Sequence, residues 1–151
     1  MRDSARWRAL LSASWLGLLL TVAGIATPAA FTTLPTADAG RVAASVLAAE
    51  AYASLAIGAL LALLERAHSR RVAAAGDGTQ FGSGLLLALG ALFCTVAGYF
   101  GVLPLMADAR SGRGPFSFGQ LHAASTAFYA VKVVLVAMLA WRSTRGASSS
   151  G

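Results

Sequence analysis

Four long apolar stretches alternate with short polar segments along the chain. The apolar stretches cover residues 9–31, 42–64, 83–106 and 121–141. Each holds about the 20 consecutive, mostly apolar residues that an α-helix needs to cross the hydrocarbon core of a bilayer. The pattern predicts an all-α protein, an integral membrane four-helix bundle.

Polar segments flank and connect the predicted spans. Residues 1–8 form a basic N-terminal head, residues 65–82 the longest loop, and residues 142–151 a flexible tail rich in serine and glycine. A basic head before an apolar run also begins a signal peptide, but this run is longer than the roughly 7–15 residues of a signal's apolar region. We therefore expect the first span to be retained.

The arginines are distributed unevenly between the two ends of the predicted bundle. The head, the second loop and the tail hold eight of them: Arg2, Arg6, Arg8, Arg66, Arg70, Arg71, Arg142 and Arg145. The opposite side holds only Arg41, Arg110 and Arg113. Because basic loops stay on the cytoplasmic side of a membrane, this bias predicts that both termini are cytoplasmic.

Composition agrees with a membrane protein and argues against a nucleic-acid partner. The 151 residues are 57% hydrophobic and 12% charged, whereas soluble domains carry about 25% charged residues. The formal charge of +6 comes from scattered arginines, with no basic face interleaved with aromatic residues. We expect the lipid bilayer as partner and no nucleic acid.

A lysine interrupts the fourth apolar stretch near its middle. A charge at the bilayer centre costs roughly 2.5–3.5 kcal/mol on insertion scales, so Lys132 should face other helices. His122, Ser125, Tyr129 and Lys132 recur at spacings that place them on one helical stripe. In the second span Glu50, with Ser54 one turn later, is the natural partner, and we expect Glu50 and Lys132 to pair inside the bundle.

This polar seam leaves two interpretations open. It serves assembly in a structural or accessory membrane component, or it belongs to a transporter-like or proton-handling module that uses Glu50 and Lys132. The sequence contains no Ser/His/Asp order, no paired carboxylates and no phosphate-binding loop. It therefore predicts no catalytic and no cofactor-binding residues, and it argues against an enzyme without deciding the question.

Soft and borderline metal donors are present but dispersed. Cys94 lies inside the third span, whereas Met106 and His122 lie near the outer surface. No CxxC, HxxxH or Met-rich pattern brings such donors together. The sequence predicts no metal site and no cofactor.

A faint repeat relates the two halves of the chain. The segment 21–24 reads Thr-Val-Ala-Gly and precedes Pro28 and an Ala-Asp-Ala turn; the segment 95–98 reads the same and precedes Pro104 and another Ala-Asp-Ala. Both copies cross the predicted membrane in the same direction. The pattern is typical of a parallel two-helix duplication.

Several short motifs resemble one family. They are Trp15-Leu16-Gly17, Thr27-Pro28-Ala29-Ala30-Phe31, Ala37-Asp38-Ala39-Gly40-Arg41, Glu50-Ala51-Tyr52 and Phe118-Gly119-Gln120-Leu121-His122-Ala123-Ala124-Ser125. Together they resemble the small four-helix membrane proteins of the domain of unknown function 4149, also called transmembrane protein 205-like. The resemblance implies a multi-pass protein of the bacterial inner membrane and brings no established activity. A homo-oligomer or another membrane protein is the partner that such a small bundle suggests.

That family is also distantly similar to copper-resistance D-like membrane proteins, which include haem-binding oxidases. This likeness implies a third alternative, a copper-resistance-type metal or haem membrane protein. The chain departs from those relatives because it lacks a second histidine inside the predicted spans; His68 lies in the second loop.

Overall fold

The computed structural model describes residues 2–148, with side chains from residue 4 to residue 145. The described residues form helices and connecting turns, with no strand among them. In chain order the elements are α1 (Arg2–Thr21), η1 (Val22–Ala26), α2 (Thr27–Thr33), α3 (Thr36–Ala74), α4 (Ser83–Thr95), η2 (Val96–Gly101), α5 (Val102–Arg110) and α6 (Phe118–Ser148).

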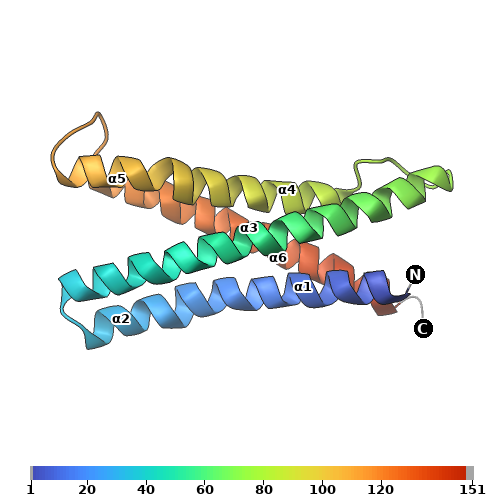
Figure 1. Ribbon diagram of the computed structural model, residues 1–151, viewed down its shortest axis with the longest axis horizontal. Helices are drawn as coiled ribbons and strands as arrows, with labels where there is room; N and C mark the ends of the chain where they lie inside the picture. The colour runs from blue at the N-terminus through green and yellow to red at the C-terminus, as the bar shows by residue number, and fades with distance from the viewer. Residues whose placement is uncertain (1, 149–151) are drawn as a thin grey trace.

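These elements build four long helical rods, and each rod runs antiparallel to the one before it in the chain (Figure 1). The first rod is α1 with η1 and α2, and the third is α4 with η2 and α5. Helices α3 and α6 are the second and fourth rods. In the view of Figure 1 these two helices cross, and the chain ends lie beside each other at one end of the molecule.

The first and third rods are continuous although each contains a π-helical segment. In η1 the widened turn is closed by the N–H of Thr27, which bonds to the carbonyl of Val22 five residues earlier. Pro28 follows as the second residue of α2, so the widened turn lies directly before the residue that has no N–H to donate. The helix widens before the proline and continues to Thr33.

Helix α3 is much longer than the apolar stretch 42–64. It begins at Thr36, directly after a turn at Leu34 and Pro35, and ends at Ala74. At about 1.5 Å per residue its 39 residues measure about 58 Å, nearly twice the hydrocarbon thickness of a bilayer. The connecting loop is therefore residues 75–82 and not the predicted 65–82. Arg, Glu and Ala favour helix in this segment, and Glu65 and Ser69 are buried against neighbouring elements.

The C-terminal segment is also more regular than expected. Helix α6 continues to Ser148, through most of the predicted flexible tail. The guanidinium carbon of Arg145 lies 4.6 Å from the ring centroid of Trp141, and this cation–π contact supports the last part of the helix. Residues 149–151 of the predicted tail lie outside the described part of the chain.

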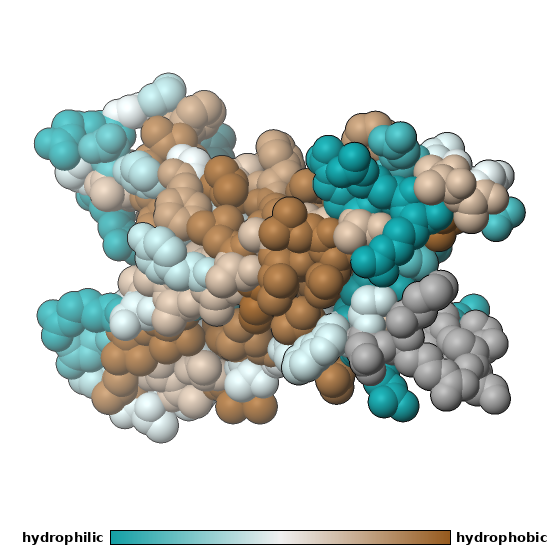
Figure 2. Space-filling model, turned by 45° about the vertical axis from the view of Figure 1, so that its right-hand side comes forward, coloured by the Kyte–Doolittle hydropathy of each residue, from teal (hydrophilic) through white to brown (hydrophobic). Residues whose placement is uncertain are grey.

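The core combines a few large side chains with small ones. Its fully buried members are Trp15, Leu19, Leu61, Ala88, Ala91, Val136 and Leu139, contributed by α1, α3, α4 and α6. Large apolar side chains such as Leu63, Phe93 and Val134 point outward and are about half exposed or more. Figure 2 shows the result: an apolar band crosses the middle of this face, and polar surface gathers at both ends.

All four rods are long and apolar enough to cross a membrane. A surface this apolar would be unfavourable in water, because exposed apolar patches on soluble proteins rarely exceed a few hundred Å². The length, composition and surface of the bundle are those of a multi-pass membrane protein.

Candidate functional site

Glu50 of α3 and Lys132 of α6 meet inside the bundle. The Nζ atom of Lys132 lies 2.8 Å from Oε1 and 3.0 Å from Oε2 of Glu50, so one ammonium group donates to both carboxylate oxygens. The two side chains are 4% and 3% exposed. At this burial neither charge could persist without its partner, because desolvating an unpaired ion costs several kcal/mol.

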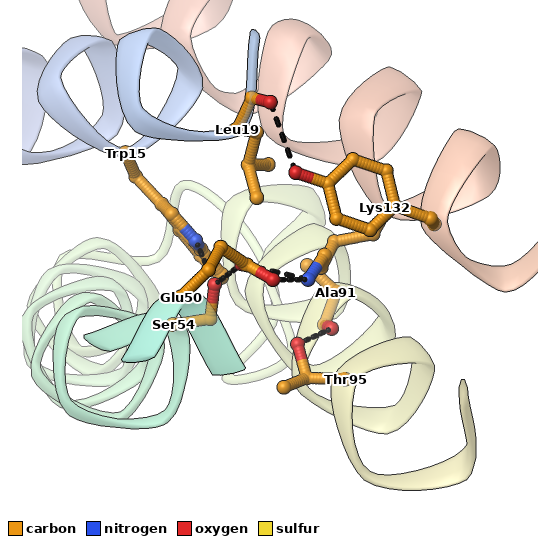
Figure 3. A network of polar contacts seen from close by, with 8 residues as sticks. Trp15, Leu19, Glu50, Ser54, Ala91, Thr95 and Lys132 are labelled. Atoms are coloured by element: carbon orange, nitrogen blue, oxygen red, sulfur yellow. Dashed lines mark hydrogen bonds and ion pairs between the residues drawn. The ribbon is translucent and has the colours of Figure 1, made fainter. Parts of the chain in front are cut away.

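Two further side chains complete the carboxylate end of the pair (Figure 3). Ser54, one turn after Glu50 on α3, donates its hydroxyl proton to Oε1 of Glu50. The indole N–H of Trp15 on α1 in turn donates to Oγ of Ser54 at 2.8 Å. A buried chain of donors thus runs from α1 through α3 to α6, and each of its polar groups has a partner.

Tyr129 organises the ammonium end. Its ring, one turn before Lys132 on α6, places the centroid 4.6 Å from Nζ, within the range of a cation–π contact. Its hydroxyl donates to the backbone carbonyl of Leu19 on α1 at 2.9 Å. Tyr129 therefore ties α6 to α1 and shields the cation from the surrounding apolar side chains.

The structure gathers four of the six residues of the predicted seam: Glu50, Ser54, Tyr129 and Lys132. Ser125 is half-buried on the same helix and lies outside this hydrogen-bond chain. His122 is exposed near the start of α6, where its ring stacks on Phe118 at a centroid distance of 5.9 Å. The predicted stripe thus continues toward the outer end of α6, but its outer part does not contact the ion pair.

A second, partly buried ion pair lies at the end of the bundle that holds the chain termini. The Nη1 atom of Arg8 on α1 contacts both carboxylate oxygens of Glu65 on α3, at 3.2 and 3.3 Å. A side chain at Gly84, in the first turn of α4, would collide with this carboxylate. Glu65 therefore sits against the start of α4, where the helix dipole favours a negative charge.

A polar cavity of about 440 Å³ opens beside this second pair. Besides Arg8 and Glu65, its walls include His68, Asp77 and Arg142. Cations and carboxylates are mixed along the walls, so their charges do not select a ligand of one sign.

Metal donors remain apart in the described part of the chain. No group of three or more His, Cys, Asp or Glu side chains lies close enough there to hold a metal ion. Cys94 is buried in α4, Met106 is buried in α5, and His122 is exposed.

Sequence reasoning missed Trp15 and the Arg8–Glu65 pair. A tryptophan in an apolar span ordinarily indicates packing. Only the folded position of Ser54 shows that the indole N–H of Trp15 has a hydrogen-bond acceptor. The predicted spans leave Arg8 in the N-terminal head and Glu65 in the second loop, so the hydropathy pattern does not pair them. Because α1 and α3 run antiparallel, Glu65 in the second half of α3 lies at the level of Arg8 near the start of α1.

Residues 10–115 match the family described as a domain of unknown function, DUF4149. The chain belongs to this family. The match covers most of the first rod, the second and third rods and part of the turn before α6, so it includes Glu50, whereas Lys132 lies beyond it. No curated protein and no solved structure gave a match to the chain.

Proposed function

We propose that this DUF4149 protein is a structural or accessory component of the cell inner membrane, with both termini in the cytoplasm. Its buried Glu50–Lys132 pair serves to hold the four helices in one arrangement. The observation that carries this proposal is the closure of the polar network around the pair.

The charged groups of Glu50 and Lys132 already have partners inside the protein, so neither is left open to bind a transported ion. The ammonium of Lys132 is bound by both oxygens of Glu50 and covered by the ring of Tyr129. The carboxylate also accepts from Ser54, which is itself bonded by Trp15. A proton carrier needs a group that water reaches from one side at a time, whereas Glu50 and Lys132 are nearly without exposed surface.

The orientation rests on the arginine bias and on the geometry of the rods. Both chain ends and the loop at residues 75–82 lie at the same end of the molecule (Figure 1). This end carries most of the arginines, and the positive-inside rule assigns it to the cytoplasm. The apolar band between the polar ends is the surface that lipid, a second copy or another membrane protein would cover.

A flux measurement tests the structural role. The purified protein is reconstituted into liposomes with a pH gradient, and the decay of the gradient is followed with an enclosed pH-sensitive dye. We expect wild-type protein and the Glu50→Gln variant to match protein-free liposomes. A wild-type flux above that of protein-free liposomes would overturn the proposal. Loss of that flux in Glu50→Gln protein that is still monodisperse in detergent would assign it to a proton-handling module.

A reporter fusion tests the orientation separately. Alkaline phosphatase, which is active only outside the cytoplasm, is fused either after Ser148 or within the outer turn at residues 111–117. We expect activity from the second fusion and none from the first. The reverse pattern would contradict cytoplasmic termini while leaving the fold unaffected.

A further inference from the structure

The two halves of the molecule have the same construction. Each begins with a rod that contains a π-helical segment, η1 or η2, and continues through a short turn into one long helix. The π segments begin at Val22 and Val96, each within a Thr-Val-Ala-Gly sequence, and a proline follows each of them. The Thr-Val-Ala-Gly and proline part of the sequence repeat therefore coincides with a repeated, uncommon backbone feature. The two Ala-Asp-Ala segments do not correspond, because the first lies at the start of α3 and the second at the end of α5, and both are helical and not turns.

The halves are also arranged equivalently. They run in the same direction, from the end with the termini to the opposite end and back (Figure 1). Helix α3 packs on α1 and α4, and α6 packs on α4 and α1, so exchanging the halves reproduces the same contacts. Likewise α2 packs on α3, and α5 packs on α6. This is a pseudo-twofold arrangement about the long axis of the bundle.

Glu50 and Lys132 occupy corresponding positions in this arrangement. Each is the fifteenth residue of its long helix, counted from Thr36 in α3 and from Phe118 in α6. A residue on the pseudo-twofold axis would meet its own equivalent from the other half. Here the two equivalents have opposite charges and form the central ion pair.

Opposite charges at equivalent positions make the interface selective. A half of the first kind, α1 to α3, carries Glu50, and a half of the second kind, α4 to α6, carries Lys132. Two halves of the first kind would place two carboxylates together, and two of the second kind would place two ammonium groups together. Either combination leaves buried like charges without compensation. The surroundings are specialised too, because Ser54 donates to the carboxylate and the Tyr129 ring covers the ammonium.

We propose that Glu50 and Lys132 are a recognition pair that makes the inner face of each half fit only a half of the opposite kind. In the wild-type chain that half comes from the same molecule. A second copy of the chain can supply it when the internal combination is disfavoured. This inference deepens the structural role proposed above and names the partner that the polar interface selects.

Two full-length single variants test the proposal. Glu50→Lys puts two lysines at the centre of the bundle, and Lys132→Glu puts two glutamates there. Expressed alone, each should give at least about tenfold less folded protein than wild type, measured as the monodisperse fraction in detergent. Expressed together with different tags, they can exchange halves, and both should recover severalfold and co-purify.

Three controls make the outcome decisive. Glu50→Lys expressed with a differently tagged copy of itself should show no recovery. Wild type with two tags measures any association that does not depend on half exchange. The Glu50→Lys/Lys132→Glu double variant should recover only in part, because its carboxylate would lie over the Tyr129 ring.

Either of two results would overturn the recognition pair. One is a double variant that folds, together with co-expressed single variants whose yield of folded protein is no higher than that of each variant expressed alone. The other is single variants that accumulate like wild type. These outcomes are independent of the liposome experiment, because a proton flux would overturn the structural role whether or not halves exchange.

Discussion

At the scale of single residues, the pairing of Glu50 with Lys132 explains why an apolar core can hold two charged groups. Glu50 and Lys132 are acceptable in an apolar interior only together, because each supplies the charge and hydrogen bonds that the other lost with water. The neighbouring Ser54, Trp15 and Tyr129 distribute this network over three helices.

Removing one member of the pair should therefore cost far more than removing both. Glu50→Gln and Lys132→Met should each lower the free energy of unfolding by about 3–5 kcal/mol, and the double variant should recover much of that loss. Unfolding by sodium dodecyl sulfate in mixed micelles, followed by circular dichroism, provides the four values of the cycle. Strictly additive losses would mean that the two residues do not act on each other.

The indole N–H of Trp15 provides a finer test of the same network. Trp15→Phe keeps most of the apolar ring but leaves Ser54 without its donor, so the variant should lose about 1 kcal/mol. Trp7→Phe shows the effect of the same replacement on the same helix where the indole is 58% exposed and neither a buried hydrogen bond nor core volume is lost. The same unfolding assay should find little change for the control, and equal losses would show that the N–H contributes nothing specific.

At the scale of elements, glycines set the approach of neighbouring helices at only some positions. Gly98 in η2 lies so close to α6 that an added Cβ would be 2.8 Å from Cβ of Phe128. Gly24 in η1 is the corresponding glycine of the first half, and an added Cβ there would meet nothing within 4 Å. The same sequence motif therefore packs tightly in one half and faces open space in the other.

This difference predicts unequal effects for one substitution. Gly98→Ala should destabilise by about 1–3 kcal/mol, because a Cβ atom next to the backbone cannot rotate away from the intruding methyl group. Gly24→Ala should be neutral or slightly stabilising, since Ala favours helix over Gly. The midpoint of thermal unfolding in detergent distinguishes the two variants, and a greater loss at Gly24 would contradict this packing.

The elements also show how far sequence reasoning reaches. Hydropathy predicted the four helices because each contains a long apolar run, and Glu50 and Lys132 stood out because charges are rare in such runs. The ends of α3 and α6 were not predictable from hydropathy, since polar residues continue a helix once it leaves the apolar layer. The π segments were not predictable either, because a widened turn depends on packing and leaves no hydrophobic period of its own.

At the scale of the whole molecule, the contacts between the rods and not the connecting loop hold the halves together. Residues 75–82 are largely exposed, and Gly76 turns the chain with a positive φ of 85°. Tertiary contacts between the halves run through α1 with α6 and α3 with α4, whereas α2 and α5 at the outer end pack on α3 and α6 of their own halves.

Lengthening this loop should consequently have little effect. Ten added Gly and Ser residues after Thr79 should change the free energy of unfolding by less than about 1 kcal/mol, because each doubling of loop length costs only about 0.6 kcal/mol. The same insertion after Gly112, in the exposed turn before α6, serves as the comparison. Equilibrium unfolding of both variants checks the prediction, and a large loss confined to the first would assign the loop a part in joining the halves.

The burial of Lys132 has a practical consequence for anyone handling this protein. Lys132 is the only lysine in the sequence, and its side chain is 4% exposed. Apart from a terminal amine, the native molecule should therefore offer almost no reactive nitrogen to amine-selective acylating reagents. The rate at which Lys132 is modified would then report how often the core opens and exposes this side chain to solvent.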